Sequence, residues 1–254
     1  MLININEFKN VLKKSTLNFI INNIQLKISA DKISSKMISD DSLVIVMLDV
    51  DNQVIPDLKK DLEFNFMEPN QSVMPFLNLI EDETVDSIIK RDHILLKSSN
   101  QKSKLYFCSP RVIKIFQKDD IRDGIKFFTS FTITEEFVNI FNKIKKIGSR
   151  FGKIYLNVEN GKLTMETTDK LNTFSNSLKF DIYDNIEYDD ISLCFDYKNF
   201  VNTMSLINDN CGDFNINISY LKDQKLGLIL INNQDNSEKY YQISKIDISS
   251  WHYF

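Results

Sequence analysis

The chain has 254 residues with 43% hydrophobic and 11% aromatic content, and its formal net charge is -4. This composition is ample for the cores of one large or two ordinary globular domains, and it excludes a disordered chain. No segment approaches the roughly 18 uninterrupted apolar residues of a membrane helix, and the start MLININEFKN lacks the basic and apolar regions of a signal peptide. We therefore expect a cytoplasmic protein without membrane association.

The cysteines Cys108, Cys194 and Cys211 include no CxxC pair. Cys108 and Cys194 lie in strand-like runs, where a buried free thiol is the expected state. The odd count and the spacing predict a reducing compartment and no disulfides.

The first predicted helix is INEFKNVLKK, residues 5–14, in which Phe8, Val11 and Leu12 share one face. Period-two alternation typical of strands follows at residues 24–28 and 62–66. Between them, LVIVMLDV is typical of a strand buried on both faces. The N-terminal part of the chain is therefore predicted to pair one helix with several strands.

A second helix is predicted at VMPFLNLIED, residues 73–82, with Phe76, Leu79 and Ile80 on its buried face and Pro75 in its first turn. The segment SPRVIKIFQKDDIRDG, residues 109–124, is charged, lacks helical periodicity and ends in glycine. These features predict a connector at 110–124 between an N-terminal domain, 1–109, and a C-terminal domain, 125–254.

A third helix is predicted at TEEFVNIFNKIKKI, residues 134–147, and a fourth at YKNFVNTMSLI, residues 197–207. Between them, IYLNVENGKLTMET places Asn160 and Gly161 between two alternating runs, which is typical of a tight antiparallel hairpin. Tyr240 and Tyr241 belong to a predicted final strand.

The four predicted helices are each centred on a phenylalanine, and Phe8, Phe76, Phe137 and Phe200 recur at similar intervals. One helix followed by several strands therefore occurs four times. The predicted fold class is α+β, with two similar domains that each contain two helix-plus-antiparallel-strand repeats.

Positive charge gathers on the faces of these helices that point away from the core. The stretch NIFNKIKKIGSRFGK, residues 139–153, has five basic residues and no acidic one, although the whole chain is acidic. Two interpretations remain open at this point: a solvated helix face, or a surface that contacts a phosphate backbone.

Three stretches resemble DNA sliding clamps, the processivity factors of replicative polymerases, and are most similar to those of tailed phages. They are MPFLNLIEDETVDSIIKRDHILLKSSNQKSKLYFCSP, FTITEEFVNIFNKIKKI and the closing EKYYQISKIDISSWHYF. The long loop DVDNQVIPD and the aromatic residues Trp251 and Tyr253 depart from the clamp pattern. The resemblance covers nearly the whole chain and implies the DNA clamp fold.

The resemblance implies a homotrimeric ring of two-domain subunits around double-stranded DNA, with helices lining the hole and contacts that do not depend on base sequence. It also implies loading by an ATP-driven clamp loader and docking of a DNA polymerase beside the connector. The DNA-facing residues would be Lys9, Lys13, Lys14, Lys143, Lys145, Lys146, Arg150 and Lys198. The partner pocket would be lined by Val112, Ile115, Phe116, Ile246 and Ile248.

An enzyme is the first alternative, but His93 and His252 are the only histidines, and the chain has no glycine-rich phosphate loop and no metal-ligand spacing. The acidic pairs at 49 and 51 and at 189 and 190 suit solvated turns better than a divalent ion. We therefore expect no catalytic activity, no cofactor and no metal.

Two further alternatives are a β-rich structural virion protein and a clamp-fold accessory factor that serves transcription. The second alternative would have late-transcription factors as partners. The lysine and asparagine character of the helix faces disfavours an inert structural role, because such a role gives no reason to keep acidic residues away from them. If the protein is viral, the host cytoplasm is its expected location.

Overall fold

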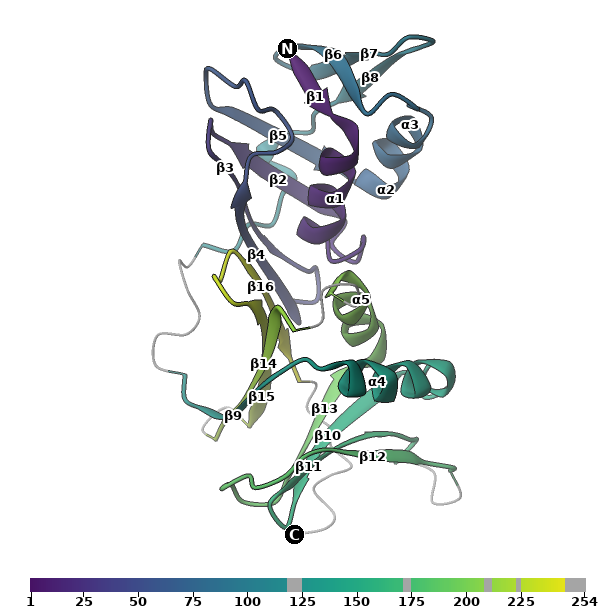
Figure 1. Cartoon of the computed structure of the whole chain (residues 1–254), viewed down its shortest axis with the longest axis vertical. Coiled ribbons are helices and arrows are strands. Elements are labelled where there is room, and N and C mark those ends of the chain that lie inside the picture. Colours follow the sequence, from purple (N-terminus) through teal and green to yellow (C-terminus); the bar gives the residue numbers. More distant parts are fainter. Residues whose placement is uncertain (118–124, 171–174, 208–211, 223–224, 245–254) are drawn as a thin grey trace. The chain divides into compact units, whose positions relative to one another are not determined.

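The computed structural model describes residues 1–117, 125–170, 175–207, 212–222 and 225–244. The chain divides into two compact units, Met1–Gln117 and Lys118–Phe254. The boundary lies inside the predicted connector, residues 110–124. Each unit is a mixture of short helices and antiparallel sheets, as Figure 1 shows.

The elements follow one order in each unit. Unit 1 contains β1 (Leu2–Asn4), α1 (Ile5–Ser15), β2 (Asn23–Ile28), β3 (Lys32–Ile38), β4 (Val44–Asp51), β5 (Leu62–Met67), α2 (Pro69–Ser72), α3 (Met74–Asn78), β6 (Thr84–Ile89), β7 (His93–Lys97) and β8 (Lys102–Tyr106). Unit 2 contains β9 (Phe127–Thr132), α4 (Glu135–Gly148), β10 (Lys153–Glu159), β11 (Lys162–Thr167), β12 (Leu178–Tyr183), β13 (Ile191–Asp196), α5 (Tyr197–Ile207), β14 (Phe214–Leu221), β15 (Leu226–Asn233) and β16 (Glu238–Ile243).

This order confirms the four predicted repeats and adds a strand in front of each helix. Each repeat runs strand, helical segment, then three strands, starting at β1, β5, β9 and β13. The α+β fold class and the dominance of antiparallel pairing are therefore as the sequence predicts.

The leading strand of each repeat pairs with the other repeat of its unit. In unit 1, β1 pairs with β6 and β5 pairs with β2, through partners such as Leu2 with Asp86 and Asn23 with Met67. In unit 2, β9 pairs with β14 and β13 pairs with β10. Each unit is therefore built by two repeats that exchange their first strands.

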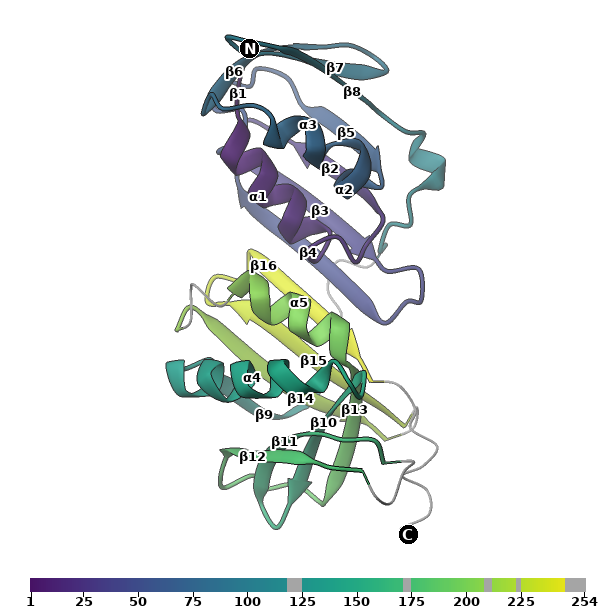
Figure 2. The ribbon, with the colours of Figure 1, turned by 90° about the vertical axis from the view of Figure 1, so that its right-hand side faces the viewer.

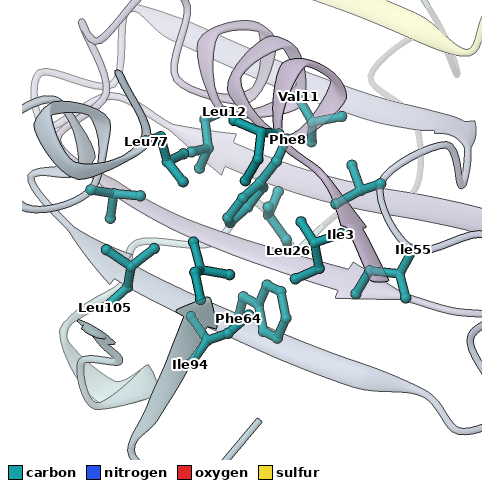
Figure 3. Packing of buried hydrophobic residues seen from close by; sticks show 14 of the residues in the cluster. Ile3, Phe8, Val11, Leu12, Leu26, Ile55, Phe64, Leu77, Ile94 and Leu105 are labelled. Carbon is teal, nitrogen blue, oxygen red and sulfur yellow. The ribbon is translucent and has the colours of Figure 1, made fainter. Parts of the chain in front are cut away.

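The core of unit 1 lies where its helices meet both sheets. Phe8, Leu12 and Leu26 from the first repeat pack with Leu77 and Ile94 from the second, as Figure 3 shows. Burying a large apolar side chain contributes about 1.5 to 3 kcal/mol, so this cluster fixes the helices on the sheets. The lysine faces of the helices are left on the outside.

The predicted second helix is wrong in its register. Two short helices, α2 and α3, replace one, and the residues that point inward are Val73, Met74, Leu77 and Ile80. Phe76 and Leu79 are 43% and 69% exposed. The cause is a break at Val73, whose φ of -122° and ψ of -54° depart from helical geometry, with Pro75 starting the next turn. The new register rotates Phe76 away from the core.

The predicted hairpin in unit 2 is confirmed. Glu159 pairs with Lys162 across Asn160 and Gly161, which have φ values of 52° and 75°. Both central residues therefore adopt the left-handed conformation that this turn type needs, and glycine reaches it without strain.

The cysteines differ partly from expectation. Cys194 is buried and free, as predicted, but Cys108 is only half-buried and follows β8 instead of lying in a strand. Cys211 lies outside the described residues. No helix in the described ranges is long and apolar enough to cross a membrane.

Candidate nucleic-acid interface

Helix α1 presents a polar face made of lysine and asparagine. Its N-terminus is capped by Asn4, whose side-chain oxygen accepts a hydrogen bond from Glu7 N at 3.1 Å. Phe8, Val11 and Leu12 are buried, so the helical period turns Asn10 and Lys13 to solvent. Lys9 and Lys14 lie half-buried on the flanks of this face.

Lysines on α1 are close enough to affect one another. Partial burial, together with repulsion from Lys13 four residues along, lowers the pKa of Lys9 below its usual value. An anion close to this turn would relieve that repulsion. The face is therefore electrostatically prepared for a phosphate group.

Helix α4 carries the largest group of positive charges. Thr134 caps its start by accepting a hydrogen bond from Phe137 N at 3.2 Å, and the two acidic residues Glu135 and Glu136 lie in the first turn, where the helix dipole favours them. The opposite end carries Lys145 and Lys146 in its last turn, and Arg150 follows the helix. Positive charge is thus concentrated at the C-terminal end.

Contacts with neighbouring elements orient two of the α4 lysines. Lys143 Nζ lies 5.6 Å from the centre of the Phe180 ring on β12, and is therefore turned towards the sheet edge. Lys145 Nζ donates a hydrogen bond to Ser205 Oγ on α5 at 3.3 Å, which places these two helices side by side (Figure 2). Lys146 is exposed on the outward face.

Helix α5 continues the polar surface with fewer charges. Asp196 accepts a hydrogen bond from Asn199 N at 3.1 Å at the start of the helix, and Lys198 is exposed there. Ser205 is also exposed, and Asn202 donates to Lys198 O at 2.8 Å. Lysine, asparagine and serine therefore form its outward face, as the sequence predicts.

The short helices α2 and α3 contribute no basic residue. Their exposed side chains include Asn70, Gln71 and Asn78, together with the apolar Phe76 and Leu79. Positive charge in the described structure is therefore spread over α1, α4 and α5, and the second repeat supplies amide and apolar groups instead.

The described part of the connector lies along β3. It opens with a 3₁₀ turn at Pro110–Val112, which the sequence did not predict and which Ser109 caps by accepting a hydrogen bond from Arg111 N at 3.4 Å. Phe116 N donates to Lys36 O at 2.9 Å, and Ile115 pairs with Met37 in an isolated antiparallel bridge.

The predicted pocket residues divide into three groups. Val112 and Ile115 are 52% and 38% exposed and available to a partner, while Phe116 is half-buried. Ile246 and Ile248 lie outside the described residues. Sequence analysis missed Lys114, which lies between the two exposed residues and contacts the turn after β3. Its place amid an apolar run was the available sign.

The acidic pairs considered as metal ligands have other surroundings. Asp51 forms an ion pair with Lys32 at 2.9 Å, and Asp189 lies 3.8 Å from Lys222. Among the described residues, no group of three or more His, Cys, Asp and Glu side chains is arranged to hold a metal ion. His93, at the first position of β7, is hydrogen-bonded to Asp92 at 2.7 Å.

No protein-family model and no curated protein sequence matches the chain. Solved structures match it along almost its whole length. The structure of DNA polymerase III subunit beta from Pseudomonas aeruginosa has a TM-score of 0.67 at 11% identity, over 96% of this chain and 66% of that one. In the PCNA2-PCNA3 complex from Sulfolobus tokodaii, the matched chain gives 0.64 at 15% identity, over 97% of this chain and 100% of that one.

A third structure holds the C-terminal region of FEN-1 bound to A. fulgidus PCNA, with a TM-score of 0.65 at 9% identity over 97% of this chain and 98% of that one. The chain therefore has the sliding-clamp fold, and the fold that the sequence resemblance implies is confirmed. It spans about two thirds of the bacterial beta subunit and nearly the full length of the PCNA-type chains.

Proposed function

We propose that this protein is a DNA sliding clamp, a ring that encircles duplex DNA and tethers a replicative DNA polymerase for processive synthesis. The observation that carries the proposal is the presence of outward lysine faces on α1, α4 and α5 within a sliding-clamp fold. No catalytic residue and no cofactor is needed, because the ring acts through topology.

The electrostatics suit a protein that must slide. Lysine and amide groups make weak contacts with phosphates that do not read base sequence, whereas arginine forks favour specific readout. Charges separated by more than about 8 Å are largely screened at physiological salt, so a net charge of -4 does not cancel a local basic surface. We assign the DNA-facing role to Lys9, Lys13, Lys14, Lys145, Lys146, Arg150 and Lys198, with Lys143 at the margin.

The self-association in this proposal is a homotrimer. Two units cannot surround a duplex alone, and the clamp resemblance implies closure with six. The near-complete coverage of PCNA-type chains supports a two-unit subunit. Strands β8 and β12 lie at edges of their sheets in strand order and are candidates for the joint between subunits.

The two edges have complementary side chains. On β8, Lys102, Lys104 and Tyr106 are exposed. On β12, the half-buried Leu178, Phe180 and Ile182 alternate with exposed residues that include Asp181. Pairing of β8 from one subunit with β12 of the next would satisfy both strand edges and bring lysine towards aspartate.

The connector is the proposed docking surface for the polymerase, with Val112 and Ile115 as its exposed apolar groups. The complex of A. fulgidus PCNA with the C-terminal region of FEN-1 supports recognition of terminal peptides by this fold. Loading would require an ATP-driven clamp loader. The protein would act where its DNA is, which is the host cytoplasm if it is viral.

Topological binding can be tested directly with DNA ends. The protein is incubated at high concentration with linear duplex DNA, the same duplex with both ends blocked by biotin and streptavidin, and a closed circle, each without a loader. A ring threads over free ends only, so retention on the open linear DNA alone supports the proposal. Equal binding to all three would mean ordinary surface contact and would contradict encirclement.

Stimulation of the polymerase encoded in the same genome then distinguishes replication from the transcription alternative. Longer products per binding event on a primed circle, with a loader present, support the replicative role. Encirclement without any effect on the polymerase would favour a clamp that serves transcription factors. The structural virion alternative predicts neither result, and the matched clamp structures do not favour it.

A further inference from the structure

Lys114 connects the connector to the turn between β3 and β4 through all three donors of its ammonium group. Its Nζ donates to Ser39 O at 3.3 Å, to Asp40 O at 3.1 Å and to Ser42 Oγ at 2.8 Å. An ammonium group has three N–H donors, so these three acceptors can satisfy it completely. Such a contact differs from an ordinary surface lysine, which is solvated at its tip.

The acceptors belong to a turn that is held together by its own hydrogen bonds. Ser39 N donates to Val44 O, Ser42 N donates to Ser39 O, and Val44 N donates to Ser39 Oγ, at distances of 2.9, 2.9 and 3.0 Å. Ser39 Oγ in turn donates to Asp41 Oδ1 at 2.6 Å. The carbonyl groups that face Lys114 are therefore fixed before the lysine arrives, and little ordering of the turn is required.

The connector itself has few other anchors on this sheet. Ile115 and Met37 form a single bridge, and Phe116 N donates to Lys36 O at 2.9 Å. Ile113, one residue before Lys114, is 8% exposed, whereas Val112 and Ile115 on either side of this pair are exposed. The backbone geometry of the two exposed residues thus depends on how firmly this short stretch is held.

We propose that Lys114 is a latch, a positioning residue that holds the connector on the β3–β4 turn and so presents Val112 and Ile115 at a fixed spacing to an apolar peptide. The identity of the peptide rests on the proposed clamp function, whereas the latch itself does not. A connector that is already ordered loses less conformational entropy when a partner binds, so the latch raises affinity without touching the partner.

The latch is tested by amide hydrogen exchange on the full-length protein. Lys114→Met keeps the aliphatic stem and removes the three donors, and Lys59→Met is the matched control at an exposed lysine of the loop between β4 and β5. We expect the Phe116 amide to exchange about tenfold faster in Lys114→Met, because a charge-assisted hydrogen bond contributes on this scale. Lys59→Met should leave it unchanged. Unaltered Phe116 exchange in Lys114→Met would overturn the latch.

Ser42→Ala separates the latch from a general loss of packing. This change removes only the acceptor at 2.8 Å, so it should accelerate Phe116 exchange less than Lys114→Met does. Combining both changes should add nothing beyond Lys114→Met, since the hydroxyl acts through the lysine. Lys114→Arg retains donors and should recover most of the protection. Additive effects, or no recovery with arginine, would contradict the assignment.

A binding measurement tests the positioning role. The probe is a synthetic peptide from the C-terminus of the DNA polymerase encoded in the same genome. Lys114→Met should weaken its affinity about three- to tenfold at an unchanged thermal midpoint, because order is lost only in the connector. Faster exchange with unchanged affinity would overturn positioning. If the unaltered protein does not bind the peptide, the partner surface of the proposed function is wrong, and the exchange experiment still decides the latch.

Discussion

Gly148 lies so close to Tyr197 that a Cβ atom at this position would be 2.5 Å from Cε2 of the tyrosine ring. Gly148 is the last residue of α4 and Tyr197 the first of α5. The tyrosine hydroxyl donates to Lys145 O at 2.7 Å, so the ring cannot swing away without losing a hydrogen bond. The close approach of these two helices is therefore permitted by the absence of a side chain on Gly148.

Gly148→Ala should lower the free energy of unfolding by about 1 to 3 kcal/mol through overpacking against Tyr197, despite the gain of about 1 kcal/mol in helix propensity. Urea denaturation of the single variant measures this effect. In a Tyr197→Ala background the clash is gone and only the propensity remains, so the same change should stabilise the protein. Destabilisation of equal size in both backgrounds would show that the contact is not the cause.

Replacing Lys13, Lys146 and Lys198 together with glutamate should abolish clamp-dependent processivity without unfolding the protein, because all three side chains are exposed. The slope of log affinity against log salt for linear DNA should fall by about 3, since each phosphate that a lysine no longer neutralises lowers it by roughly one. The matched control replaces the exposed Lys59, Lys60 and Lys90, which lie outside the helices, and changes the net charge equally. Equal effects of the two sets would mean that only net charge matters.

Lys104→Pro should block self-association while leaving the subunit folded. Phe107 N donates to Asp92 O and Ser98 N donates to Gln101 O, so the alternation of an antiparallel ladder turns the N–H of Lys104 towards the open edge of β8. Proline is tolerated at such a position but cannot donate to a new strand.

Sedimentation velocity at several concentrations measures this change. The unaltered protein should form trimers and Lys104→Pro should raise the dissociation constant about tenfold or more, which corresponds to about one lost hydrogen bond per joint. Lys104→Ala, which keeps the N–H, should associate normally. An intact trimer in Lys104→Pro would place the joint elsewhere, and a dimeric wild-type protein would contradict the proposed ring.

Val112→Ser combined with Ile115→Ser should eliminate binding of the C-terminal peptide of the cognate polymerase. Burying two such side chains contributes about 1.5 to 3 kcal/mol each, and after the costs of ordering this predicts affinity near micromolar. Isothermal titration calorimetry measures both proteins. Phe76→Ser combined with Leu79→Ser removes a similarly exposed apolar pair on α3 and should leave the affinity unchanged. Loss of binding in that control instead would move the docking surface to α3.

Much of the fold could be predicted because local patterns specify it. The helical spacing around Phe8, Phe137 and Phe200 places all three in the core, and Asn160 with Gly161 marks a hairpin that forms as expected. The outward lysines of α1 and α5 follow directly from those helices. Where one buried phenylalanine sets the register of a regular helix, the opposite face is set as well.

The remaining features depend on tertiary structure and leave a weak local pattern. Phe76 has helical spacing to Leu79 and Ile80, yet the break before Pro75 changes which side faces inward. A strand as short as β1 has no periodicity to detect, so the exchange of leading strands could not be predicted. Lys143 turns towards Phe180, and no helical wheel contains that neighbouring strand.

The exchange of leading strands has a consequence for synthesis on the ribosome. The partner of β1 is β6, so the first strand waits for its place until the whole first repeat and the helices of the second have been made. A nascent chain that ends after β4 exposes one open sheet flank where β5 belongs and holds an unplaced β1. Arrested intermediates of that length should be sensitive to proteases and bound by chaperones, and protection should appear only after β6 has left the exit tunnel.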